Sequence, residues 1–310
     1  MTVFNLRTNE EISLTDDMRI CAALGNFDGV HLGHAEILEY AAKKPDGATH
    51  SAVWTFRTHP DVCRKKSDAR ILTSCEQKFD LFRSFGIDIA ILDDFENIAD
   101  LSAEDFAKKT LYGDCRVRSA VCGFNYRFGK GAAGSAGALV DLLAPLGAPV
   151  HVMPPKTLRG TVISSTEIRN RIENGEIAAA NEMLGHPFAI FLPVTEGRKI
   201  GRTIGIPTIN QVFPAYYAIP KFGVYACRCK VDGVPHIALS NVGVRPTVTD
   251  GKVAVNCETH IIDFDGWLYG KKVQVDFYQF LRPEKKFDDL GKLKDQIERD
   301  IEKTKEYFSK

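Results

Sequence analysis

Short apolar segments alternate with amphipathic segments along the first half of the chain. Apolar runs that predict buried strands lie at residues 20–24, 52–56, 87–92, 119–122 and 150–153. Between them, residues 76–85 and 103–111 show helical patterns that end at Gly86 and Gly113. Repeated strand–helix units of this length indicate an α/β domain, with a parallel sheet and helices on both of its faces.

The pattern changes in the second half of the chain. Two short helices are predicted at residues 164–173 and 176–184, and strands are predicted at residues 224–231, 237–244, 253–262 and 272–280. Asp-Gly pairs at 232–233, 250–251 and 265–266 are strong hairpin signals. We expect a small antiparallel β-barrel with a terminal helix, and we place the domain boundary at His186-Pro187, giving domains 1–186 and 187–310.

Composition narrows the class of protein. The 40 Lys and Arg residues balance the 40 Asp and Glu residues, and no basic stripe interleaved with aromatic residues is present, so we expect no nucleic-acid partner. No apolar stretch has the length of a membrane span, and the first residues do not resemble a signal peptide, so we expect no membrane partner and a cytoplasmic location. The eight cysteines include no C-x-x-C pair, which favours buried, reduced thiols. The oligomeric state is left open.

Residues 25–34, GNFDGVHLGH, carry the strongest chemical signal. A predicted strand leads into this glycine-rich turn, and the turn opens a helix whose free N–H groups suit a phosphate. His31 and His34 can donate hydrogen bonds to oxygens that gain charge during nucleotidyl transfer. The segment resembles the signature shared by small adenylyl- and cytidylyltransferases and class I aminoacyl-tRNA synthetases, and the alternative is a surface loop with solvated histidines. The residues expected to bind ATP and its phosphates here are Gly25, Asn26, Phe27, Asp28, Gly29, His31 and His34.

Two more segments of the first half suit ligand binding. The glycine-rich stretch 123–134 follows a predicted strand and carries aromatic residues that could stack on a flat ring, although a flexible loop is the alternative. Ser164, Ser165 and Arg169 at a helix start can clamp a triphosphate. A simple helix cap, with Ser164 as N-cap and Glu167 closing a capping box, is the alternative and is compatible with binding.

The second half carries its own phosphate-binding pattern. Gly197, Gly201 and Gly205 recur every four residues, with cations such as Arg202 between them, which suits a backbone cradle for phosphates. If residues 208–210 are extended, Thr208 and Asn210 face one side and can hold a hydrated Mg²⁺ with its phosphates. The alternative is a glycine-rich hairpin of the barrel.

Glu258 lies inside an apolar predicted strand, where a carboxylate is costly unless it is paired or active. As a general base it could take the proton of a substrate hydroxyl. A salt bridge to Arg245 or Arg282 is the alternative.

Over nearly its whole length the chain resembles the bacterial bifunctional riboflavin kinase/FAD synthetase family. The resemblance rests on GNFDGVHLGH, GFNYRFGKGAAG and ISSTEIR in the first domain, and on GRTIGIPTIN, NVGVRPTV and CETHIIDF in the second. It implies a Rossmann-like nucleotidyltransferase domain that adenylylates FMN to FAD and releases pyrophosphate. It also implies a barrel domain that phosphorylates riboflavin to FMN, and both steps would use ATP and Mg²⁺.

The resemblance also implies roles for matching residues. His31 and His34 would act at the adenylyl transfer, Ser164, Ser165 and Arg169 would hold the triphosphate, Thr208 and Asn210 would bind the Mg²⁺–nucleotide, and Glu258 would be the kinase base. The residues expected to contact flavin are Asn125, Tyr126, Phe128 and Arg282. The sequence departs from the family pattern at Ile209, where alanine is common, and at Arg57 and Thr58, where an acid and a proline are common.

Two other functions compete with this interpretation. One is a nucleotidyltransferase for another small phosphorylated substrate with a non-catalytic β domain, which leaves Thr208, Asn210 and Glu258 without a role. The other is a flavin-binding regulatory module that has lost catalysis, against which the intact His31 and His34 argue.

Overall fold

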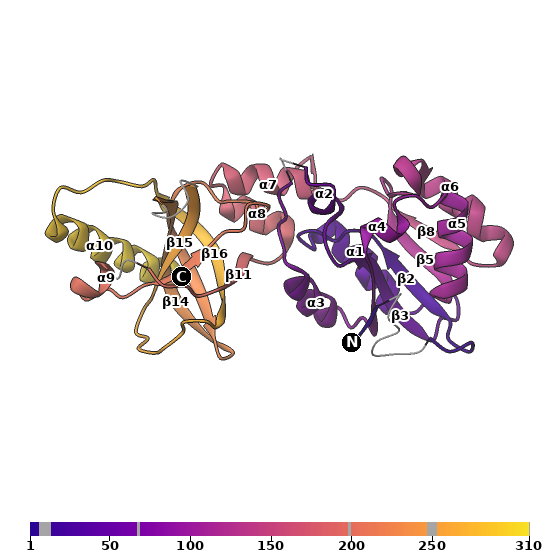
Figure 1. Ribbon diagram of the computed structural model, residues 1–310, viewed down its shortest axis with the longest axis horizontal. Helices are drawn as coiled ribbons and strands as arrows, with labels where there is room; N and C mark the ends of the chain where they lie inside the picture. The colour runs from indigo at the N-terminus through magenta and orange to yellow at the C-terminus, as the bar shows by residue number, and fades with distance from the viewer. Residues whose placement is uncertain (6–13, 67–68, 198–199, 247–252, 310) are drawn as a thin grey trace. The chain divides into compact units, whose positions relative to one another are not determined.

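The computed structural model describes residues 1–5, 14–66, 69–197, 200–246 and 253–309 (Figure 1). The chain divides into two compact units, Met1–Ser165 and Thr166–Lys310. This division lies before His186-Pro187, because the helices α7 (Ser165–Glu173) and α8 (Ile177–Leu184) lie almost wholly in the second unit. The functional limits at 186 and 187 stay a prediction.

A six-stranded parallel sheet forms the centre of the first unit. Its strands, in spatial order, are β1 (Thr2–Asn5), β4 (Ile89–Asp93), β3 (His50–Phe56), β2 (Ile20–Leu24), β5 (Val117–Gly123) and β8 (Val150–Met153). The five predicted strands are all present, and the edge strand β1 was not predicted. The expected α/β class with a parallel sheet is confirmed.

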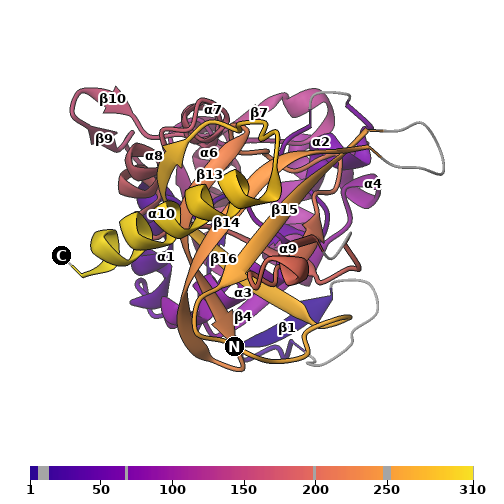
Figure 2. The ribbon, with the colours of Figure 1, turned by 90° about the vertical axis from the view of Figure 1, so that its left-hand side faces the viewer.

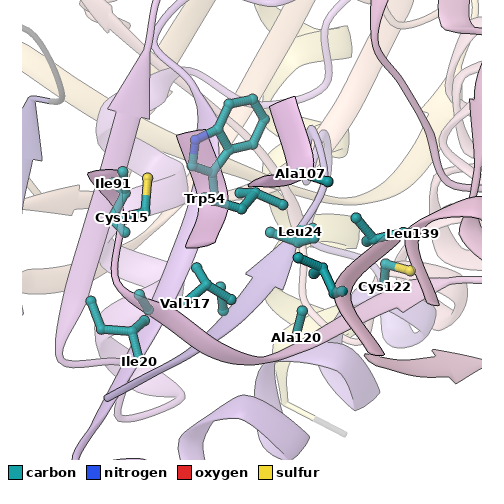
Figure 3. Packing of buried hydrophobic residues seen from close by; sticks show 14 of the residues in the cluster. Ile20, Leu24, Trp54, Ile91, Ala107, Cys115, Val117, Ala120, Cys122 and Leu139 are labelled. Atoms are coloured by element: carbon teal, nitrogen blue, oxygen red, sulfur yellow. The ribbon is translucent and has the colours of Figure 1, made fainter. Parts of the chain in front are cut away.

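Helices cover both faces of this sheet. Alternate residues of β2 point to opposite faces, and since they are apolar, each face buries its set against helices. Ile20 and Leu24 pack in a core with Trp54 and with the helical segments that contain Ala107 and Leu139 (Figure 3). Residues of β2 that point to the other face pack with α1 and α3. The helices of the unit are α1 (Leu32–Ala42), α2 (Pro60–Cys63), α3 (Cys75–Ser84), α4 (Phe95–Ile98), α5 (Ala103–Asp105) and α6 (Ala136–Leu143).

The predicted helix at 103–111 is present in a modified form. After α5, residues Phe106–Asp114 form a π-helical segment, whose last turn is closed by a bond from the N–H of Cys115 to the carbonyl of Thr110. Two short hairpins complete the unit, β6 (Arg127–Phe128) with β7 (Gly134–Ser135), and β9 (Thr157–Leu158) with β10 (Thr161–Val162). Short 3₁₀ turns occupy Lys130–Ala132 and Ala144–Leu146.

The second unit is built around an antiparallel six-stranded barrel, as predicted. In spatial order its strands are β11 (Phe188–Pro193), β16 (Lys272–Arg282), β13 (Gly223–Val231), β14 (Val234–Pro246), β15 (Val253–Ile261) and β12 (Ile209–Val212). The buried side chain of Gln211 links the two edges, because its amide donates to the carbonyls of Leu192 at 2.7 Å and Val273 at 2.8 Å. A short helix α9 (Ile200–Thr203) precedes β12, and the terminal helix α10 (Leu290–Phe308) lies against β13 and β14 (Figure 2).

The three predicted hairpins have different outcomes. Asp232 and Gly233 join β13 to β14 with φ values of 46° and 85°, as a tight turn between twisted strands requires. The hairpin at Asp265-Gly266 was a wrong prediction, because β16 pairs with β11 and β13 and the segment after β15 crosses to a distant strand. Asp250-Gly251 lies outside the described residues.

The eight cysteines are free thiols, and six of them are buried. This confirms the expectation of reduced, buried thiols.

Candidate active sites

Two of the predicted binding segments meet at one edge of the parallel sheet. The 25–34 turn follows β2 and the 123–134 loop follows β5, and these strands are parallel neighbours, with Leu24 beside Cys122. The chain order reverses at this point, because β3 and β4 lie on one side of β2 while β5 and β8 lie on the other. Ligands of open α/β sheets bind in the crevice at such a point, beyond the carboxyl ends of the strands.

The 25–34 turn holds an unusual backbone conformation. Phe27 and Val30 have positive φ values of 50° and 41°, which cost energy for residues that carry a Cβ. Both side chains are fully buried, and the Phe27 ring contacts Phe82 and His34 edge-on, at centroid distances of 5.6 and 5.2 Å. This packing offsets the strain and fixes the direction in which the turn enters α1.

Asp28 stabilises the turn from within. Its side chain is 4% exposed, and its Oδ1 accepts hydrogen bonds from the backbone N–H groups of Leu72 at 2.8 Å and Thr73 at 3.2 Å. Ser165 Oγ donates to the Asp28 carbonyl at 2.8 Å, so it also holds the turn. The structure thus places these two predicted phosphate-binding residues together and gives each a positioning contact that the sequence did not indicate.

His31 and His34 lie at the start of α1 and contact each other. His31 is the N-cap, and its Nδ1 accepts a hydrogen bond from the backbone N–H of His34 at 3.2 Å. The neutral His31 ring therefore carries its proton on Nε2. Burial, followed by the nearby His31 and Lys78, holds the pKa of His34 well below its usual value of 6.5. The His34 ring is thus neutral, and among the described residues its buried Nδ1 has no hydrogen-bond partner, whereas the His31 ring can donate from Nε2.

The predicted flavin contacts after β5 differ in exposure. Asn125 is exposed, whereas Phe128 is only 6% exposed and packs on Phe106 at a centroid distance of 5.5 Å. Tyr126 stacks on Phe128 at 5.7 Å, and burial raises its pKa. Phe124, which we did not assign to a ligand, is 49% exposed beside Asn125.

The segment 164–169 spans the division between the units. Ser164 and Ser165 end the first unit, and α7 begins at Ser165, as the pattern predicted. Arg169 lies in α7 within the second unit. The carboxylate of Glu167 pairs with Arg171 at 2.9 Å.

A cavity of about 260 Å³ opens on the barrel of the second unit. Four predicted site residues from distant parts of the sequence line it, namely Gly201, Thr208, Glu258 and Arg282. Leu239 on β14, with Leu293 and Ile297 on α10, gives the cavity an apolar wall. The structure therefore combines a carboxylate, a hydroxyl and a guanidinium with a surface that suits a flat, apolar ring.

A chain of polar side chains joins Glu258 to Asn210. The two residues face each other on β15 and β12, and Asn256 Nδ2 donates to Asn210 Oδ1 at 2.8 Å and to Glu258 Oε1 at 3.3 Å. The expectation that Glu258 is a costly buried acid was wrong, because the cavity exposes it to solvent. The hydrogen bond from Asn256 nevertheless fixes the orientation of the Glu258 carboxylate.

The alternative of a salt bridge from Glu258 to Arg282 was also wrong. Arg282 pairs with Asp300 of α10, whose carboxylate accepts from both Nε and Nη2 at 2.8 Å. Asp300 is 1% exposed, so this pair is desolvated on one side and faces the cavity on the other. The side chain of Arg245 lies outside the described residues.

The glycines at 197 and 201 are required by close packing. A Cβ on Gly197 would overlap the amide of Asn210, and a Cβ on Gly201 would overlap the carbonyl of Ile206. Gly205 has a φ of 78°. Arg202 is exposed, and its Nη2 donates to the hydroxyl of Tyr269 at 3.3 Å.

Sequence comparisons match both halves of the chain. A family model described as FAD synthetase matches residues 14–167, and one described as riboflavin kinase matches residues 184–308. The bifunctional riboflavin kinase/FMN adenylyltransferase of Listeria monocytogenes is 35% identical over 95% of this chain and 94% of its own length, and that of Escherichia coli K12 is 33% identical over 92% and 91%. This chain belongs to the bifunctional riboflavin kinase/FMN adenylyltransferase family.

The two enzymes of the family occupy the expected order, with FAD synthetase first and riboflavin kinase second. The kinase match across the barrel removes the reason to treat that domain as non-catalytic. The crystal structure of the macrolide-efflux protein from Streptococcus pneumoniae has the same fold, with a TM-score of 0.83 and 27% identity over 98% of this chain and 99% of that chain. Within the described ranges of our chain, we find no helix with the length and apolar character needed to span a bilayer.

Proposed function

We propose that the two reactions of the family take place at the two sites described above. FMN adenylylation would occur at the turn after β2, and riboflavin phosphorylation would occur in the barrel cavity. The observation that supports this most strongly is the separation of the two sets of groups, since His31 and His34 lie in the first unit and Glu258 lies in the second. The protein would act in the cytoplasm.

At the first site, a phosphate oxygen of FMN would attack the α-phosphorus of ATP, and the bond to pyrophosphate would break. No covalent enzyme intermediate is needed, so the protein contributes positioning and charge stabilisation. The N–H groups at the start of α1 and the Nε2–H of His31 would donate to the phosphate oxygens. Gly25, Asn26 and Gly29 would allow the backbone to approach them, and Ser164 and Arg169 would hold the triphosphate.

At the second site, Glu258 would accept the proton of the riboflavin hydroxyl as that oxygen attacks the γ-phosphorus of ATP and ADP leaves. Asn256 supports this role because it donates to one carboxylate oxygen and so directs the other. The backbone around Gly197, Gly201 and Gly205, with Arg202, would bind the nucleotide phosphates. Arg282 would contact the flavin in this domain, and Asn125, Tyr126 and Phe128 would contribute to flavin binding in the other.

The residues present fit a Mg²⁺ ion at Thr208 and Asn210. Thr208 lines the cavity, and Asn210 directs a side-chain oxygen to the same polar network as Glu258. Mg²⁺ usually keeps several waters and takes few protein oxygens besides substrate phosphates, so two neutral donors are sufficient. The ion would neutralise charge on the phosphates of ATP.

Flavin chromatography with two variants tests the assignment. His31→Asn keeps a side chain that can cap α1 and removes the imidazole, so FMN should accumulate from riboflavin without FAD. Glu258→Gln should produce no FMN from riboflavin but still convert supplied FMN to FAD. If either variant loses both reactions while it remains folded, the assignment of two sites is wrong.

A further inference from the structure

Lys78 is a buried lysine close to the adenylylation site. It lies on α3 and is 7% exposed, and its Nζ donates to the backbone carbonyls of Asn26 at 3.2 Å and Phe56 at 3.3 Å. Asn26 belongs to the turn after β2, and Phe56 ends β3. The ammonium therefore ties together the carboxyl ends of two neighbouring strands.

The charge of Lys78 is only partly compensated by its surroundings. Among the described residues, no carboxylate lies within ion-pair distance of its Nζ, and burying an ammonium in this way costs several kcal/mol. The titratable groups that face it are Cys75 on α3, Asp28 in the turn and His34 on α1. Burial lowers the pKa of Lys78, while Cys75 and Asp28 act in the opposite direction.

A neutral side chain would be the less costly choice if the strand ends only needed to be joined. A positive charge gains its full effect when an anion approaches, because electrostatic interactions are strong where water is excluded. The turn after β2 is the place where we expect a triphosphate. A bound triphosphate at this turn would therefore offset the free-energy cost of burying the Lys78 ammonium.

We propose that Lys78 is a positioning residue for FMN adenylylation, which fixes the ends of β2 and β3 and, while protonated, holds a positive charge close to His34. The charge would favour the bound triphosphate and the departing pyrophosphate without touching them. This inference rests on the proposed function of the turn. Sequence reasoning missed the residue because a lysine in an amphipathic helix usually indicates a solvent-facing position.

Lys78→Arg and Lys78→Met separate charge from packing. In the wild type, the rate of FMN adenylylation should fall at high pH, with a pKa below the ordinary lysine value, as the ammonium loses its proton. Lys78→Arg should retain part of the activity and lose this fall, because guanidinium stays charged. Lys78→Met should be slower by about 100-fold throughout and should lose the fall as well.

The control is Lys108→Met, which removes an exposed lysine in the same unit and should change neither the rate nor the pH profile. Riboflavin phosphorylation and thermal unfolding report whether each variant is folded. If Lys78→Met does not fold, Lys78→Gln replaces it. Wild-type rates in Lys78→Met or Lys78→Gln, or an unchanged fall at high pH in Lys78→Arg, would overturn the inference. When the Lys78 variants give such a result, His31→Asn shows which proposal is wrong. If His31→Asn also leaves FAD formation intact, the proposed function of the turn is wrong. If His31→Asn abolishes FAD formation, only the proposed role of Lys78 is wrong.

Discussion

The imidazole rings of His31 and His34 lie face to face, with centroids 3.6 Å apart and planes inclined by 14°. Two positive charges at this distance would repel strongly, so the two rings do not both become protonated, and burial keeps the His34 ring neutral. The backbone N–H of His34 also donates to Nδ1 of His31, which fixes the tautomer of the His31 ring. The pair therefore presents an oriented donor to an incoming phosphate.

Gly33→Ala tests the packing of this pair. A Cβ at Gly33 would lie 3.2 Å from Cε1 and 3.3 Å from Nδ1 of His31, so the ring must move by a few tenths of an ångström. We expect FAD formation to fall by about tenfold, since small displacements of catalytic groups are costly. Alanine favours the helix by up to about 1 kcal/mol, so the thermal midpoint should not fall appreciably.

Gly137→Ala is a matched control for that variant. Gly137 occupies the same position after the N-cap of α6 as Gly33 does in α1, but a Cβ there meets only Ser135 Oγ at an ordinary 3.8 Å. It should leave FAD formation unchanged. Equal activities of the two alanine variants would show that the position of the His31 ring is unimportant.

The stability of the first unit should depend on pH through His34. Its pKa is lowered in the folded state, so below pH 6.5 the unfolded chain binds more protons than the folded chain. The contribution of neutral His34 to the free energy of unfolding is fully present above the pKa that His34 has in the unfolded chain. It is lost as the pH falls below that value, at up to about 1.4 kcal/mol per pH unit. Denaturant unfolding of the wild type and His34→Gln from pH 7.5 to 5 measures it, and parallel curves would contradict the prediction.

Gly197→Ala should act selectively on the kinase reaction. The new methyl group would overlap the amide of Asn210 and displace it from Asn256, which also contacts Glu258. FMN formation should fall by about 100-fold, because the proposed Mg²⁺ ligand and the orientation of the base are both disturbed. Conversion of supplied FMN to FAD in the same sample is the control, and an unchanged rate of FMN formation would exclude a role for this packing.

Asp300→Ala should destabilise the barrel unit. It removes a carboxylate that is 1% exposed and leaves Arg282 without its ion-pair partner, a change that typically costs about 3–5 kcal/mol. Arg282 should also lose its orientation toward the cavity, which should raise the KM for riboflavin. Calorimetry and steady-state kinetics measure the two effects, and a variant with wild-type stability and KM would show that the pair is dispensable.

The parts that sequence analysis predicted well have strong periodic signals. Buried strands such as 20–24 are continuous apolar runs, and their edges are marked by glycine, so both the fold class and the place of His31 and His34 followed. The hairpin at Asp265-Gly266 was wrong because the Asp-Gly signal is local, whereas the order of strands in a barrel depends on long-range pairing.

The local chemistry was harder to predict than the location of the sites. The exposure of Glu258 and the pairing of Arg282 with Asp300 depend on α10, which is distant in sequence and contributes to the cavity. The burial of Lys78 likewise depends on two strand ends that meet only in the folded chain. Pattern analysis cannot detect such contacts, because each partner alone is typical of a surface residue.

Mixing two inactivated variants tests the central claim of two independent sites. His34→Asn should convert riboflavin to FMN and stop, and Glu258→Gln should convert FMN to FAD but not use riboflavin. When equal amounts are mixed with riboflavin, ATP and Mg²⁺, chromatography should show FMN first and FAD afterwards, at rates limited by each intact site. If the mixture forms no FAD although both variants are folded, the two reactions do not reside in separate sites.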